Sequence, residues 1–180
     1  KKKGFKTLHG LHAALINDLA ERPTLAEAHF ITASETKNGL SLRPMQLMGS
    51  FYERTGKPGK AGAVYGKYLE QHPGSRLLGP ALTRLESGAV PERDLTGAAD
   101  GAAEALFGVA GSLRQQDAGE TALVFGYLAL YLRPDFPMAQ IMVADLLESS
   151  DRLEDANELY ASIRRDSPLA WSARLRRASN

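Results

Sequence analysis

The side chains best suited to metal binding or acid–base chemistry are four histidines, His9, His12, His29 and His72. His9 and His12 are three residues apart on an expected helix, so their rings can face the same way. A zinc site needs at least a third protein ligand, and the sequence places none evidently beside them. We therefore expect surface or partly buried histidines, a structural role for His72 in a helix-ending turn, and no metal ion or other cofactor.

A second candidate for chemistry is the glycine-rich segment 56–62, GKPGKAG, which superficially resembles a phosphate-binding loop. It lacks the Gly-x4-Gly-Lys-Ser/Thr spacing, no strand precedes it, and it falls on an expected turn between two helices. The sequence has no Gly-x-Ser-x-Gly elbow, no His-Glu-x-x-His pair and no calcium-loop pattern. Cysteine is absent, which removes a thiol nucleophile. We expect no catalytic residues and no enzyme activity.

The charge of the chain is nearly balanced, with 22 Lys+Arg against 21 Asp+Glu and a net charge of +1. That balance excludes the bulk basic field of typical nucleic-acid binders. Basic residues do gather near both ends, without interleaved aromatic residues for base stacking: Lys1, Lys2, Lys3, Lys6, Arg164, Arg165, Arg174, Arg176 and Arg177. They form either solvated faces and a tail, or a docking surface for an acidic partner or nucleic acid. We expect no nucleic-acid partner.

The length of 180 residues, 43% of them hydrophobic, is enough for a sizeable core. No apolar run approaches the roughly 18 residues of a membrane span. The lack of cysteine is compatible with either cytoplasm or periplasm. The chain opens on three lysines with no Met and no apolar segment after them, so we expect a processed protein or a piece of a longer one.

A 34-residue period organises much of the chain. Pro73, Pro134 and Pro168 each follow an apolar segment with helical spacing, and 168 − 134 = 34. With proline at the thirty-second place, units begin at Leu42, Ala103 and Pro137, and a weaker copy begins at Thr7. Small residues recur at the eighth and twentieth places: Gly49, Ala110, Ala144, Ala61, Ala122 and Ala156. Mostly large residues recur at the eleventh, twenty-fourth and twenty-seventh: Tyr52, Leu113, Leu147, Tyr65, Gly126, Tyr160, Tyr68, Ala129 and Ile163.

This pattern has a physical reason. Small residues let two helices approach closely, large ones fill the space beside them, and proline ends the second helix of each pair. The chain therefore resembles the tetratricopeptide repeat family, most strongly over 42–73 and 103–168 and more weakly over 7–37. Two departures are Gly126 in place of a large residue and the absence of Trp at the fourth place.

The resemblance implies an all-α fold, an α-solenoid of antiparallel helix pairs in a right-handed superhelix, forming one domain over 1–180. Its units would span about 7–41, 42–75, 76–87 with a loop at 88–97, 98–136, 137–170 and a final helix at 171–178. The expected helices are 7–20, 24–36, 42–55, 57–71, 76–87, 98–116, 119–132, 136–149, 153–166 and 168–178. The sequence style resembles that of high-GC bacterial tetratricopeptide proteins.

One unit is expected to be incomplete. The period places a unit at Arg76 and the next at 110, but that next unit starts at Ala103, seven residues early. The intervening residues 88–97 are rich in turn formers, so this unit is expected to carry a loop in place of its second helix. In the last helix, Trp171, Leu175 and Ala178 are spaced either to cover the open end of the stack or to receive further repeats.

The family resemblance also suggests a binding surface. In such proteins the first helix of each pair lines a concave groove, through the second, fifth, ninth, twelfth and thirteenth places. The candidate partner-binding residues are Arg43, Gln46, Ser50, Arg54, Glu104, Phe107, Arg114, Met138, Ile141 and Asp145. Phe107, Met138 and Ile141 either anchor an apolar side chain of a partner or pack against their own neighbours.

These residues favour a protein-interaction scaffold that binds a partner peptide or helix of unknown identity. The Lys and Asn that clamp a peptide carboxylate in one subfamily are absent, because Gln46 and Ser50 occupy those places in the clearest unit. The alternative is a structural segment of a larger repeat protein that self-associates through the ends of its repeat stack. A catalytic or enzyme-accessory domain is the third and weakest hypothesis.

Overall fold

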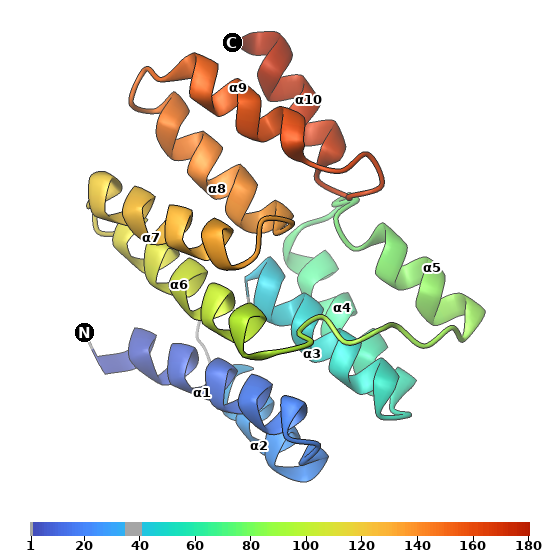
Figure 1. The fold of residues 1–180 in the computed structure, drawn as a ribbon. Coiled ribbons are helices and arrows are strands. Elements are labelled where there is room, and N and C mark those ends of the chain that lie inside the picture. The colour runs from blue at the N-terminus through green and yellow to red at the C-terminus, as the bar shows by residue number, and fades with distance from the viewer. Residues whose placement is uncertain (1, 35–40) are drawn as a thin grey trace. The chain divides into compact units, whose positions relative to one another are not determined.

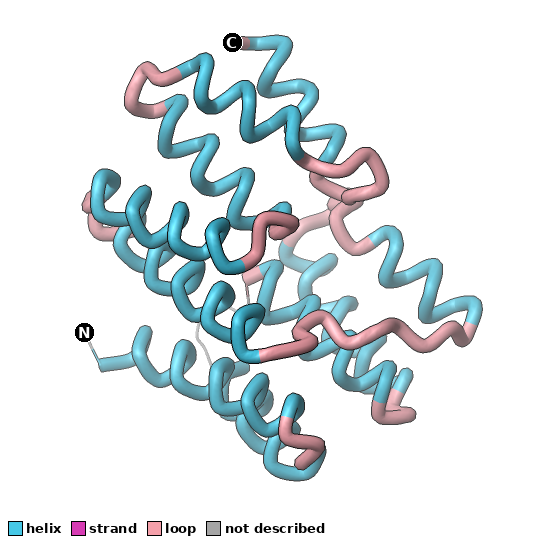
Figure 2. Tube along the Cα trace, in the orientation of Figure 1, coloured by secondary structure: helices cyan, strands magenta, loops and turns pink. Residues whose placement is uncertain are grey.

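The computed structural model of the chain describes residues 2–34 and 41–180. Within these residues the chain forms ten α-helices and no strand, which confirms the all-α class (Figure 1). Successive helices pack as pairs joined by short loops, as expected for an α-solenoid (Figure 2). The chain divides into two compact units, residues 1–97 and 98–180. The single domain over 1–180 and the right-handed superhelix stay predictions.

The first unit contains five helices: α1 (Lys2–Leu19), α2 (Pro23–Ser34), α3 (Leu42–Arg54), α4 (Pro58–Gln71) and α5 (Gly79–Ser87). α1 packs on α2, and α3 packs on α4, with α5 against both helices of that second pair. Gly88 has a positive φ of 71° and ends α5 in the left-handed conformation that glycine adopts without strain. Residues 88–97 contain no helix, as the broken period predicts.

Segment 88–97 is nevertheless attached to the first unit. Leu95 is buried in the same hydrophobic core as Phe30 and Tyr65, and Arg43 of α3 pairs with Asp94 at 3.3 Å. In that core, Phe30 of α2 contacts Phe51 of α3 with ring centroids 5.1 Å apart. These contacts join the two helix pairs into one unit.

The second unit also contains five helices: α6 (Ala98–Arg114), α7 (Gly119–Leu132), α8 (Pro137–Glu148), α9 (Leu153–Ser162) and α10 (Ala170–Ser179). α6 packs on α7 and α8 on α9, while α7–α8 and α9–α10 contacts connect the pairs. The core runs between neighbouring helices in three clusters rather than around one centre. Val143 and Leu147 of α8 and Tyr160 of α9 belong to the largest of them.

Two glycines allow close contacts between neighbouring helices. A Cβ on Gly49 would lie 2.2 Å from Cε1 of Tyr65, so glycine at this position lets the tyrosine ring lie against α3. A Cβ on Gly126 would lie 2.5 Å from Cγ2 of Val143. Gly126, which departs from the family pattern at the twenty-fourth place, therefore lets α7 approach α8 closely.

The expected helix bounds agree with the structure to within a few residues. Helix 119–132 is confirmed at both ends. The first helix begins at Lys2 rather than Thr7, and α5 begins at Gly79 rather than Arg76, with Pro80 in its first turn. α9 ends at Ser162 rather than Asp166, because Ile163 is extended. The expected end of the second helix at 35–36 and the turn at 38–39 lie outside the described residues.

Candidate functional site

Ion pairs between successive first helices follow the repeat. In the first unit, the acid at the twelfth place pairs with an arginine of the next first helix: Asp18 with Arg54 at 2.5 Å, and Glu53 with Arg84 at 2.9 Å. In the second unit Glu148 pairs with Arg176 of α10 at 2.9 Å. In one pair the charges are exchanged: the basic residue, Arg114, holds the twelfth place, and it lies 3.8 Å from the acid Asp145 of the next first helix.

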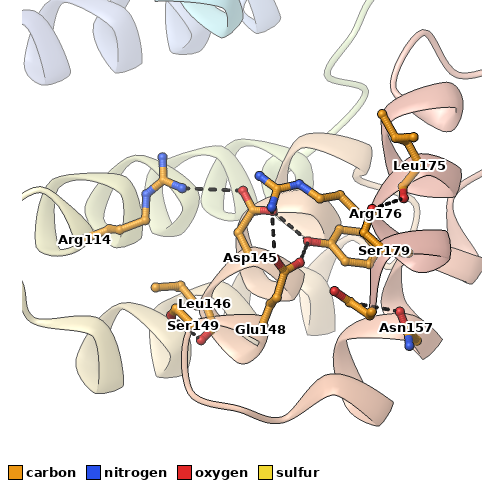
Figure 3. A network of polar contacts seen from close by, with 11 residues as sticks. Arg114, Asp145, Leu146, Glu148, Ser149, Asn157, Leu175, Arg176 and Ser179 are labelled. Atoms are coloured by element: carbon orange, nitrogen blue, oxygen red, sulfur yellow. Dashed lines mark hydrogen bonds and ion pairs between the residues drawn. The ribbon is translucent and has the colours of Figure 1, made fainter.

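In two of the repeat units, the residue at the twenty-fourth place is a buried tyrosine that forms hydrogen bonds with the acids of these ion pairs. Tyr65 donates its hydroxyl to Glu53 at 2.6 Å. Tyr160 lies 2.7 Å from a carboxylate oxygen of Asp145 and 2.9 Å from one of Glu148. Burial, and then hydrogen bonding to these carboxylates, raises the pKa of both phenols well above its ordinary value. Figure 3 shows the second network, with Asp145 and Glu148 lying between Arg114 and Arg176.

The candidate residues of the first unit lie within its own packing. Arg43 is buried and paired with Asp94, and Arg54 donates to both carboxylate oxygens of Asp18. Ser50 is buried and Gln46 is half-buried. A partner that approached α3 would therefore meet Arg43 and Arg54 already held in ion pairs.

The candidate residues of the second unit are likewise engaged. Glu104 is buried and lies 3.4 Å from Arg133. Phe107 and Met138 pack in one cluster with Phe136, and the centroids of the Phe107 and Phe136 rings are 5.0 Å apart. Ile141 packs elsewhere, against the cluster of Val143 and Leu147, while Arg114 and Asp145 are brought together. Partner binding by these residues stays a prediction.

An open apolar surface lies on a second helix, α7. Val124, Tyr127, Leu128 and Tyr131 are all exposed, Tyr131 to 83%. They border a groove of about 740 Å³ that α9 also lines. Its remaining lining residues are Leu130, Pro134, Gln140, Leu159 and Ser162. None of the lining residues carries a charge, so the groove suits an apolar ligand.

The sequence of α7 explains this surface. Residues 121–132 contain no charged side chain. One side of the helix buries Ala122, Gly126 and Ala129, and the exposed stripe runs along another side at i, i+3, i+4 and i+7. A helix that is apolar all round is normally buried, so the exposed stripe marks a contact that the second unit does not make within itself.

One side chain that lines the groove, Gln140, has an acceptor atom without a hydrogen-bond partner among the described residues. Gln140 lines the groove and is only 4% exposed. Its Nε2 donates to the carbonyl oxygen of Pro134 at 3.2 Å and to Oγ of Ser162 at 3.0 Å. Its Oε1 has no hydrogen-bond partner among the described residues. Gln140 thus orders the wall formed by α8, α9 and the loop at Pro134.

The four residues of the α7 stripe are not among the binding residues predicted from the sequence, because the family resemblance places the groove on the first helices. The sequence does contain a signal for this stripe, since residues 121–132 carry no charge and form two apolar stripes. One apolar stripe is enough to pack a helix against its core.

A second apolar face is exposed on α10. Trp171 is 69% exposed and Leu175 is 59% exposed, so these residues do not cover the end of the unit by packing on it. Ala170 and Ala173 of the same helix are buried with Tyr160. The guanidinium of Arg174 lies over the Trp171 ring, 5.5 Å from its centroid.

In the described part of the chain, no cluster of three or more His, Asp or Glu side chains could hold a metal ion. His72 stacks on Tyr68, with ring centroids 4.4 Å apart. Among the helices that the structure describes, none combines the length and apolarity needed to cross a membrane. No protein-family model matches the chain, and no curated protein matches it significantly.

Proposed function

We propose that this chain is a protein-interaction scaffold that binds an amphipathic helix of a partner protein. The observation that carries the proposal is the exposed stripe Val124, Tyr127, Leu128 and Tyr131 beside the α7–α9 groove. The proposed binding groove therefore lies along second helices, whereas the family resemblance implies a groove along the first helices.

The groove suits a helix by size and by chemistry. The stripe covers seven residue steps, which at 1.5 Å per residue is roughly 10 Å, or two helical turns. Two apolar anchors of a partner helix, spaced i and i+4, lie roughly 6 Å apart along its axis and fit within that length. Each anchor that is fully buried contributes about 1.5–3 kcal/mol. The tyrosine hydroxyls offer hydrogen bonds at the edge while the rings supply apolar contact area.

The first test locates the contact. A photo-crosslinking amino acid is placed at position 131, and in a control protein at Val90, which is also strongly exposed (69%) but lies in segment 88–97 of the first unit. Both proteins are irradiated in an extract of the source organism, and the adducts are sequenced. We expect adducts specific to position 131 that map to the apolar face of a helix. Equal adducts at both positions would contradict the proposal.

The second test removes the surface. Leu128→Glu combined with Tyr131→Glu places two charges in the exposed stripe without touching the buried core. We expect the adducts of a crosslinker at Tyr127 to disappear and the circular-dichroism spectrum and melting temperature to stay unchanged. Val90→Glu is the matched control and should leave the adducts intact. Persistence of the adducts in the double variant would show that the groove is not the binding site.

The second candidate function is a self-associating segment of a larger repeat protein. The exposed Trp171 and Leu175 favour it, because an apolar end of a repeat stack is where further repeats or another subunit would pack.

A further inference from the structure

The second unit exposes two apolar faces that complement one another. One is the α7–α9 groove, which is an open apolar surface bordered by a helix stripe. The other is the outer face of α10, where Trp171 and Leu175 are exposed one helical turn apart. The first face can receive a pair of apolar anchors, and the second presents one.

Charge distinguishes the two faces. The helices α7 and α9 carry no Lys or Arg and four acidic residues, Glu120, Glu154, Asp155 and Glu158. Of these, Asp155 is already paired with Arg152, which directly precedes α9. α10 carries Arg174, Arg176 and Arg177 and no acidic residue. A basic helix placed in a groove bordered by acidic helices is favoured by complementary electrostatic potentials, which also speed the encounter.

The helix is already in a binding conformation. Ala170 and Ala173 bury α10 against the core that contains Tyr160, and Arg176 pairs with Glu148 at 2.9 Å. The Trp171 and Leu175 face is therefore presented as a formed helix, so docking does not require a disordered segment to fold. Pre-formed binding elements lose less conformational entropy on association.

We propose that α10 of one copy of this chain docks in the α7–α9 groove of a second copy. The inference rests on the proposed function, since it names a partner for the same groove. Donor helix and acceptor groove are different surfaces, and in the head-to-tail arrangement that we propose each dimer keeps one unused groove and one unused α10. Assembly then continues into short chains or closes into a ring.

The contact is small. A single two-turn helix face buries less than the standard interface of roughly 800 Å² per partner, which places the contact among weak complexes. We expect dissociation constants in the range of about 10–100 μM. Added salt should weaken the assembly by screening the acidic and basic helices, but should not abolish it, because Trp171 and Leu175 contribute apolar contact.

Analytical ultracentrifugation of the whole chain tests this, over about 5–500 μM. The donor variant is Trp171→Glu with Leu175→Glu, and the acceptor variant is Leu128→Glu with Tyr131→Glu. We expect the wild-type chain to form dimers and larger species, and each variant alone to remain monomeric. The control Val90→Glu should associate like the wild-type chain.

Mixing the two variants is the decisive step. The donor variant keeps its groove and the acceptor variant keeps its α10, so the mixture should form a dimer of one copy of each, with no larger species. A symmetric contact of α7 with α7, or of α10 with α10, would not be rescued by mixing. A monomeric wild-type chain at the highest concentration, undiminished association of either variant, or a mixture that stays monomeric would each overturn the inference.

The self-association of the chain and its binding of another protein can be tested independently of one another. If the chain stays monomeric while the crosslinker at position 131 captures a helix of another protein, the self-association inference fails and the scaffold proposal stands. If neither contact is found, both fail.

Discussion

Arg84 of α5 donates two hydrogen bonds to the carboxylate of Glu53 in α3, from Nε and from Nη2, each 2.9 Å long. The same carboxylate accepts the hydroxyl of Tyr65 at 2.6 Å. Hydrogen bonding to Glu53 raises the pKa of the Arg84 guanidinium above its already high ordinary value. One acid thus connects the first helix of a pair, its second helix and the helix that follows. Glu148, Tyr160 and Arg176 repeat this arrangement in the second unit.

The first prediction concerns this carboxylate. Glu53→Gln keeps the size of the side chain and removes its charge, so Arg84 loses its ionic partner in a site where Glu53 itself is buried. We expect a loss of about 1.5–3 kcal/mol in the free energy of unfolding, measured by urea denaturation. Glu70→Gln, on the exposed face of α4, is the control and should change stability by less than about 0.5 kcal/mol. Equal effects of the two substitutions would contradict the assignment.

The second prediction concerns the close helix approaches. Gly49→Ala would bring Cβ to 2.2 Å from the Tyr65 ring, and Gly126→Ala would bring it to 2.5 Å from Val143. Overpacking of this kind costs about 1–3 kcal/mol. The matched controls are Gly66→Ala in α4 and Gly111→Ala in α6, because nothing lies within 4 Å of a Cβ at either site.

Because alanine favours a helix over glycine by about 0.5–1 kcal/mol, both controls should stabilise the chain. Thermal unfolding of the four variants therefore gives two melting temperatures below that of the wild-type chain and two above it. A stabilising Gly49→Ala substitution would show that α3 and α4 do not approach each other as described.

The third prediction is that the stability contributed by Glu27 is lost at acid pH. Glu27 of α2 pairs with Lys57 and, at 2.6 Å, with Lys60. The hydrogen bond from Lys57 and then that from Lys60 lower the pKa of Glu27 below its ordinary value. The stability that this group contributes is complete above its unfolded pKa and is lost as the pH falls through the lower folded pKa. We expect Glu27→Gln to flatten the acid side of a plot of melting temperature against pH, with little further difference once Glu27 is protonated in both states.

The matched control for that experiment is Glu21→Gln, an exposed acid in the turn after α1. A profile for Glu27→Gln that runs parallel to the wild-type profile over the whole acid range would show that Glu27 is not ionised more readily in the folded chain.

The fourth prediction is that the stability of the fold falls at alkaline pH as Tyr160 ionises. The pKa of Tyr160 is raised in the fold by burial and by the hydrogen bonds to Asp145 and Glu148, so the fold favours the neutral phenol. That contribution is complete below the unfolded pKa of about 10 and is lost as the pH rises above it. Tyr160→Phe should lower the melting temperature at neutral pH, by the equivalent of about 1 kcal/mol, and reduce its decline above pH ~10.

Spectrophotometric titration of the phenols provides the direct check. The Tyr160→Phe variant should lack one of the late-titrating tyrosines of the wild-type chain. If all six tyrosines of the wild-type chain ionised together near pH ~10 while the fold is intact, the hydrogen bonds of Tyr160 would be in error.

The sequence by itself determined the helices and their pairing. Helix 119–132 and the loop at 88–97 followed from apolar spacing, from Gly and Pro, and from the period, all of which act within a few residues along the chain. The bounds that differed, at Lys2, Gly79 and Ser162, lie at helix ends, where the energetic difference between one more turn and none is small. Small residues at the eighth place were likewise evident, although the close approach of Gly49 to Tyr65 was not.

The tertiary structure alone decided where the side chains of those helices lie. Nothing local in the sequence indicates that Glu104 is buried beside Arg133, or that α7 keeps Tyr131 in solvent although residues 121–132 carry no charge. Burial depends on which neighbouring helix covers a face, and contacts such as Glu53 to Arg84 join residues 31 positions apart. The candidate surface therefore became visible on a second helix only when its neighbours were in place.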